Sequence, residues 1–244
     1  MFTYAARRRR RWRRRRRLAY LAAAVLALTI AAQHAAHPHR PAIPPRARPA
    51  AHAHRTAPPA QVISAKGLRW LDFHGIQLPV SATAGPHYLH NALARGFADT
   101  PAGAVLAAVN VAVRTAAQWG PRIYRPTIIG QVTGPAARLL LAQDHRDYVA
   151  LRAAAHVPHG QPVGRSYASE TAYRLFSYTP RYAAVGIVSE GPATDGAAVR
   201  AVTRIRLRWL RGDWRVIAPP GGNWASSATT VSSLSGYTTF PSEG

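Results

Sequence analysis

Residues 199–220 read VRAVTRIRLRWLRGDWRVIAPP, and this stretch decides the fold class. One face of its first half carries small and apolar side chains: Ala201, Thr203, Ile205, Leu207 and Trp209. The other face carries Val202 and four arginines: Arg200, Arg204, Arg206 and Arg208. Alternation with a period of two is typical of a strand with one buried face. Because Arg211-Gly212-Asp213 supplies a tight turn, the stretch predicts an antiparallel hairpin whose arginine face is solvated or meets a partner.

Upstream, the apolar residues follow the spacing of helices. Asp99-Thr100-Pro101 offers capping side chains followed by proline, which predicts a helix that ends at Gly120-Pro121. A second helix is predicted from Pro135 to about Ala155, and residues 68–80 predict an entry strand or a lid. Residues 173–178 and 183–189 predict two more strands. The order predicts an α+β domain in which helices pack on one face of a curved antiparallel sheet, with most tryptophans in the core.

These segments resemble known proteins. The helix TPAGAVLAAVNVAVRTAA, followed by the hairpin, is similar to the cone-shaped fold of the nuclear transport factor two-like superfamily. Placed after a basic N-terminus, an apolar segment and a Pro-rich linker, the domain also resembles the bitopic assembly proteins of type IV secretion and conjugation systems. The segments LDFHGIQLPVSATAGP, GFADTPAGAVLAAVNVAVRTAAQWGP, APPGGNW and SGYTTFP look like an uncharacterised membrane-protein family of high-GC Gram-positive bacteria. That resemblance covers about residues 68–240 and implies no activity.

The formal net charge of +23 comes mainly from the N-terminus. Ten arginines fill residues 7–17, whereas 18 basic residues stand against all nine acidic ones from residue 61 onward. Residues 18–36 follow the arginines and predict a transmembrane anchor, because about 20 apolar residues span a bilayer and a basic flank stays cytoplasmic. Cleavage after this segment as a signal peptide remains an alternative. A second alternative is that the arginines form an arm that binds nucleic acid.

The predicted organisation has five parts. A cytoplasmic Arg-rich segment spans residues 1–17, and the transmembrane anchor spans residues 18–36. A Pro/Ala/His linker at residues 37–61 favours an extended stalk. The α+β domain at residues 62–220 then lies outside the cell membrane, and a Gly/Ser/Thr-rich tail at residues 221–244 returns to the domain or contacts a neighbour. Because the chain has no cysteine, disulfides and thiolate sites are excluded.

The carboxylates of the domain do not predict a catalytic site. Asp72 lies two residues from His74, on one face of the first predicted strand. Asp99 is interpreted as a helix cap. Asp144 and Asp147 are interpreted as parts of a solvated face of the second helix, because neighbouring helical positions point in different directions.

The histidines do not predict a metal site either. His145 lies on the same helical stretch as Asp144, and His156 and His159 flank Pro158 in a predicted loop without a third ligand nearby. We therefore predict no catalytic, cofactor-binding or metal-binding residues, and no cofactor.

Two functions from different classes follow. The first is a non-catalytic, membrane-anchored scaffold or assembly protein of a conjugation or secretion apparatus. Its partners would be the membrane, other membrane or assembly proteins, and anionic lipid at the arginines, with nucleic acid less favoured. The alternative is a small-molecule-binding or isomerase-like domain. That alternative requires a buried carboxylate or histidine that faces a pocket.

Overall fold

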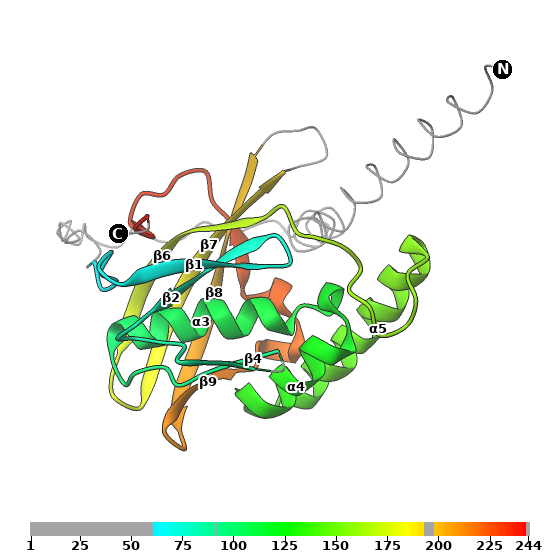
Figure 1. The fold of residues 1–244 in the computed structure, drawn as a ribbon, viewed down its shortest axis with the longest axis horizontal. Coiled ribbons are helices and arrows are strands. Elements are labelled where there is room, and N and C mark those ends of the chain that lie inside the picture. The colour runs from blue at the N-terminus through cyan, green and yellow to red at the C-terminus, as the bar shows by residue number, and fades with distance from the viewer. Residues whose placement is uncertain (1–60, 91, 193–197, 243–244) are drawn as a thin grey trace, which may run out of the picture.

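The computed structural model describes residues 61–90, 92–192 and 198–242, which form three α-helices and a large, mostly antiparallel sheet (Figure 1). The predicted α+β class is confirmed. The predicted Arg-rich segment, the anchor and nearly all of the linker lie outside the described residues. In the part of the chain that is described, no helix is both long and apolar enough to cross a membrane.

The main sheet is built on an antiparallel meander of four strands: β6 (Ser169–Tyr178), β7 (Tyr182–Pro192), β8 (Ala198–Leu210) and β9 (Asp213–Ile217). Trp209 pairs with Trp214 across the β8–β9 turn, which confirms the predicted hairpin. A two-residue strand, β5 (Val132–Thr133), continues the sheet parallel to β9. The predicted alternation in β8 is also confirmed, because Ile205 and Leu207 are buried while the arginine between them is exposed.

The helix α3 (Pro101–Thr115) packs against this sheet. It begins as predicted, because the Thr100 Oγ1 accepts a hydrogen bond of 3.1 Å from the Gly103 N–H. A separate hairpin of β1 (Leu68–Phe73) and β2 (Ile76–Ser81) covers another side of the helix. There the Asn110 side chain donates to the Pro79 carbonyl at 2.9 Å. The helix is therefore buried on two sides.

The helix α4 (Pro121–Gln131) corrects the sequence interpretation. Gly120-Pro121 does not end the first helix, because α3 already stops at Thr115. A short 3₁₀ helix, η1 (Ala117–Trp119), follows it. Pro121 then opens α4, since proline lacks only an N–H that the first turn leaves unpaired. The next helix, α5 (Ala137–Ala155), confirms the second prediction. A small hairpin of β3 (Tyr88–His90) and β4 (Leu93–Arg95) lies against α3 and α4.

After β9 the chain returns over the domain. Two short 3₁₀ helices, η2 (Pro220–Gly222) and η3 (Trp224–Ser227), lead into β10 (Ala228–Thr230), which pairs with β8. The last strand, β11 (Thr238–Thr239), pairs with β6. The segment after residue 220 therefore packs onto the domain along two strands of the sheet.

The core is closed by aromatic side chains. Trp119 and Trp214 are fully buried, and the other described tryptophans pack partly buried against the core, as predicted. Tyr173 joins the two ends of the described chain. Its hydroxyl accepts hydrogen bonds from the N–H groups of Val62 (3.0 Å) and Ile63 (3.2 Å), and its ring lies 4.9 Å from that of Phe240.

Candidate functional site

A partly open cavity of about 370 Å³ lies between the helices and the sheet. Its walls come from α3, η1 and α5 on the helical side and from β6, β7 and β8 on the sheet side. Residues 222–225 and Ala228, from the returning C-terminal segment, complete it. Cavities of this kind in ligand-binding proteins measure roughly 300–1,000 Å³. This one is at the small end of that range.

Most of the cavity wall is apolar. The helix α3 contributes small side chains, including Val109, Ala112 and Val113, because the i, i+3, i+4 stripe read from the sequence faces the sheet. The sheet contributes Ile187 and Ile205 from neighbouring strands, where the inward-facing residues alternate with outward ones. Small residues on the helix and branched ones on the sheet leave space between the two layers.

Asp144 is the polar group that distinguishes the cavity. It lies on α5, is only 7% exposed and lines the cavity, and its Oδ2 atom is buried without a hydrogen-bond partner among the described residues. Burial, and secondarily the negative charge of Asp147, raises the pKa of the Asp144 carboxyl from 3.8 to about 8. The interpretation of Asp144 as part of a solvated helix face is therefore wrong.

A second buried carboxyl, Glu170, reaches the cavity from the sheet. It lies on β6, is 6% exposed, and its Oε2 accepts a hydrogen bond of 2.8 Å from the Ser189 hydroxyl on β7. Burial raises the pKa of Glu170 to about 7, an effect that the bond from Ser189 partly offsets. Near neutral pH both carboxyls therefore hold protons that an exposed carboxyl would have lost.

Two more acidic residues line the same cavity. Asp147, one turn beyond Asp144, accepts a hydrogen bond of 2.9 Å from the Gln143 side chain. Glu190 forms an ion pair of 2.6 Å with Arg200. Four of the nine acidic residues of the chain thus line one cavity. Among the described residues that line it, none is arginine, lysine or histidine.

The C-terminal segment forms a fitted wall. A methyl group added at Gly222 would collide with the backbone nitrogen of Leu140 and with Leu139, so only glycine lets η2 lie this close to α5. Gly222 also has a positive φ of 69°. Beside it, the Trp224 indole N–H donates to the Thr115 hydroxyl at 3.0 Å, which ties the segment to the end of α3.

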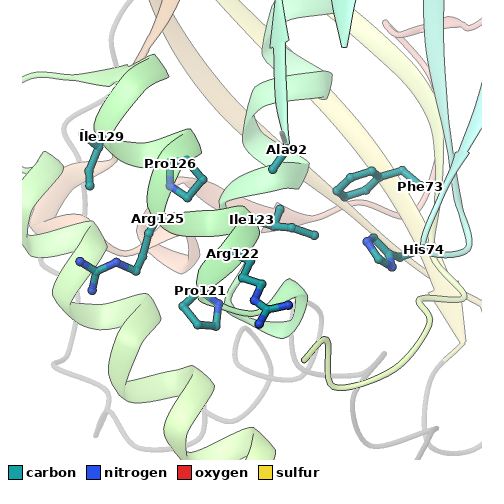
Figure 2. A pocket seen from close by; sticks show the side chains of 9 residues that line it. All are labelled: Phe73, His74, Ala92, Pro121, Arg122, Ile123, Arg125, Pro126 and Ile129. Atoms are coloured by element: carbon teal, nitrogen blue, oxygen red, sulfur yellow. The ribbon is translucent and has the colours of Figure 1, made fainter. Parts of the chain in front are cut away.

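A second, open groove lies on the surface beside α4 (Figure 2). Phe73 and His74 of the β1–β2 turn stand on one side of it, and the helix presents Arg122 and Arg125 on the other. His74 stacks on Trp119 at 5.3 Å, and burial lowers its pKa. In Figure 2 the two arginines lie apart from His74 and do not converge with it on one point. The groove has a larger volume, about 820 Å³, than the cavity between the helices and the sheet, but it lacks convergent polar groups, so we assign the site to the cavity.

A family model described as a domain of unknown function, DUF8175, matches residues 29–239. The chain belongs to this family. The match includes all secondary structure described above and extends into the predicted anchor. No curated protein and no solved structure matches the chain.

The structure of this DUF8175 protein separates the other carboxylates considered in the sequence. Asp72 is exposed and forms a 2.9 Å ion pair with Arg165. Asp99 accepts a hydrogen bond of 3.2 Å from the Tyr178 hydroxyl, and its neighbour Thr100, not Asp99 itself, caps α3. Neither Asp72 nor Asp99 lines the cavity.

The histidines also lie apart. His145 is exposed on α5, 3.3 Å from the Tyr124 hydroxyl. His156 ends α5 in a left-handed conformation, and His159 lies edge-on to Tyr148 at 5.9 Å. Within the described part of the DUF8175 protein, no three His, Cys, Asp or Glu side chains are grouped as a metal site would need. The prediction that the protein binds no metal stays a prediction.

Proposed function

We propose that the DUF8175 domain binds a small organic ligand in the cavity between α3, α5 and the sheet. This is the alternative left open by the sequence, and its requirement was a buried carboxylate that faces a pocket. The observation that carries the proposal is Asp144, a buried residue with an ionisable carboxyl that lines the cavity and has no basic partner among the described residues that line it. Largely apolar pockets with a few convergent polar groups are the usual form of small-molecule sites.

The shape of the domain agrees with this role. We infer that the domain is a nuclear transport factor two-like cone. Support comes from α3, which packs across β6 to β9, and from the cavity that opens between the helical layer and the sheet. In such an arrangement the sheet curls around a single interior space, and that space is where a ligand is held.

The domain in this proposal binds its ligand and does not catalyse a reaction. An isomerase-like reaction needs a base and, opposite it, a donor that stabilises the developing oxyanion. Asp144 and Glu170 supply carboxyls, but no tyrosine or histidine is among the described residues that line the cavity. The amide donors that are present, from Gln118, Gln143 and Asn223, suit recognition of a ligand.

Filling the cavity tests the proposal. Ala112→Phe places an aromatic ring in the cavity, and Ala154→Phe adds the same ring at an exposed position of α5 as a matched control. We expect ligand-observed NMR of a fragment library with the full-length protein to find binders that lose at least about ten-fold in affinity with Ala112→Phe, because tenfold corresponds to about 1.4 kcal/mol of lost contact. Ala154→Phe should leave them bound. Fragments that bind both variants alike, or no binders at all, would overturn the proposal.

We also propose, as the second function, the anchored assembly role. One observation favours it: Arg204, Arg206 and Arg208 form an exposed row on the outer face of β8. Such a row suits contact with an acidic partner protein.

The position of the protein in the cell tests this second role. In membranes of the producing cell, we expect full-length protein to stay in the membrane fraction and protease added from outside to digest the domain. A trimmed, soluble product would contradict the anchor and leave the ligand-binding proposal standing.

A further inference from the structure

The lining of the cavity is acidic in composition, unlike the rest of the domain. From residue 61 onward the chain has twice as many basic as acidic residues, yet the lining of the cavity includes four acidic side chains and, among described residues, no basic one. The ion pairs of the described residues are Arg165–Asp72 and Arg200–Glu190. Asp144, Asp147 and Glu170 thus line the cavity without a cationic partner from the described chain.

The geometry of Asp144 supplies a second, independent observation. Asp144 is 7% exposed, and its Oδ2 finds no hydrogen-bond partner among the described residues. A buried polar oxygen without a hydrogen-bond partner destabilises the folded state. Asp144 therefore destabilises the fold without a ligand, and its place in the cavity lining is accounted for if a ligand pairs with its carboxyl group.

We propose that the ligand of this cavity is a small organic cation, a protonated amine carried on an apolar body. This rests on the proposed function. An ammonium group has three N–H donors and no acceptor, which matches a site that offers carboxyl oxygens from α5 on one side and β6 on the other. The apolar body would contact Val113, Ile187 and Ile205.

Other charged ligands fit less well. An anion would meet Asp147 and would find no basic side chain among the described residues that line the cavity, since Arg200 is paired with Glu190. For a metal ion, no three His, Cys, Asp or Glu side chains of the described residues are grouped closely enough. Because the wall is mainly apolar, a bare hydrated cation would also leave most of the cavity surface without favourable contacts.

The affinity of an amine should depend on pH in a defined direction. The charged or titratable groups around Asp144 are Asp147 on α5, Glu170 on β6, Tyr124 on α4, and Glu190 with its partner Arg200. Since burial raises the pKa of Asp144 to about 8 and that of Glu170 to about 7, both are largely protonated at pH 6. Affinity for an ammonium should rise from pH 6 to pH 8.5, and binding at pH 7 should release protons to the buffer.

Three probes that share an aromatic body test the inference. They are 2-phenylethylamine, which is cationic, 2-phenylethanol, which is neutral, and 3-phenylpropanoate, which is anionic. Calorimetry with the full-length protein in nanodiscs of neutral lipid, with empty nanodiscs as blank, avoids attraction of the amine to anionic lipid. We expect the amine to bind at least about tenfold more tightly than the alcohol, because hydrogen bonds between charged groups are stronger than neutral ones, and we expect the anion not to bind.

The variants locate the charge. Asp144→Asn keeps the size of the side chain and should remove most of the preference for the amine while changing the affinity for the alcohol less than about twofold. Asp72→Asn, at an exposed ion pair that is not part of the cavity lining, should change neither. If the amine and the alcohol bind equally and Ala112→Phe abolishes the binding of both, the inference is overturned. The proposal that the cavity is a binding site would then still stand. Failure of all three probes would also overturn it, and the fragment screen would then decide on the cavity itself.

Discussion

Replacing Asp144 by Asn is expected to make the protein several kcal/mol more stable at pH 9 and to remove most of its loss of stability between pH 5 and pH 9. The pKa of Asp144 is about 8 in the folded protein and 3.8 ordinarily, so the folded state keeps a proton that the unfolded chain releases. The resulting stability is full below about pH 4 and is lost as the pH rises through about 8. One pKa unit corresponds to about 1.4 kcal/mol, which places the effect on the order of 3–5 kcal/mol.

Urea unfolding of full-length protein at pH 5 and pH 9 measures this effect. The wild type should lose several kcal/mol between the two pH values, and Asp144→Asn should lose much less, with a remainder from Glu170. Asp72→Asn serves as the control, because that carboxylate is exposed and paired with Arg165. If Asp144→Asn and the wild type respond to pH alike, the buried carboxyl does not hold its proton in the folded state.

A methyl group at Gly222 should cost about 3 kcal/mol or more and detach the C-terminal wall of the cavity. The added carbon meets the backbone of Leu139 and Leu140, which cannot move without shifting α5. Overpacking of this kind costs about 1–3 kcal/mol, and the left-handed backbone adds about 1–2 kcal/mol. Gly221 is the matched control: it has a similar φ of 65°, but nothing lies within 4 Å of the position of an added methyl.

Melting temperature and limited proteolysis should separate these two glycines. We expect Gly221→Ala to lower stability by about 1 kcal/mol, from the backbone conformation alone. Gly222→Ala should lower it further and expose residues 223–242 to protease. Equal effects of the two substitutions would mean that η2 is not held closely against α5.

The alternating strands were predictable because their period is local. In β8 every second residue faces the core, and the turn at Gly212 has a φ of 74° that glycine adopts readily. The same local view failed at α3. Asn110 and Arg114 are polar residues four positions apart, a spacing typical of a solvated helix face, but the β1–β2 hairpin buries both, with the Arg114 guanidinium 4.5 Å from the centre of the Phe73 ring. Burial by a second, distant layer leaves no local signal.

Glu170, one of the two buried carboxyls of the site, could not be predicted from the spacing of residues in β6. Counting back in twos from the buried Tyr173 places residue 171 on the inner face and Glu170 on the outer one. An irregularity in the pairing of β6 with β7 between Glu170 and Ala172 reverses this order, and Glu170 therefore lies opposite Ser189. A β-bulge re-aims a side chain in this way without a marked change in composition.

Asp144 was missed for a different reason. Asp144 is followed by His145 and Arg146, and three polar residues in a row indicate a solvated turn of helix. Those two neighbours are indeed exposed. The segment η2, about 80 positions further along the chain, packs against α5 at this point, where a glycine permits the close approach. Only the position of Gly222, within the quoted APPGGNW segment, gave any indication in the sequence.

Tyr173 has a mechanical consequence. Its hydroxyl holds Val62 and Ile63, and its ring contacts Phe240, so the domain is entered and left at the same strand, β6. A mechanical force applied between residues 61 and 242 would act on β6. The hydrogen bonds among β7, β8 and β9 would not carry that force. For the same reason, joining residue 242 to residue 61 and opening the chain at the β8–β9 turn should give a circular permutant in which every strand keeps its neighbours.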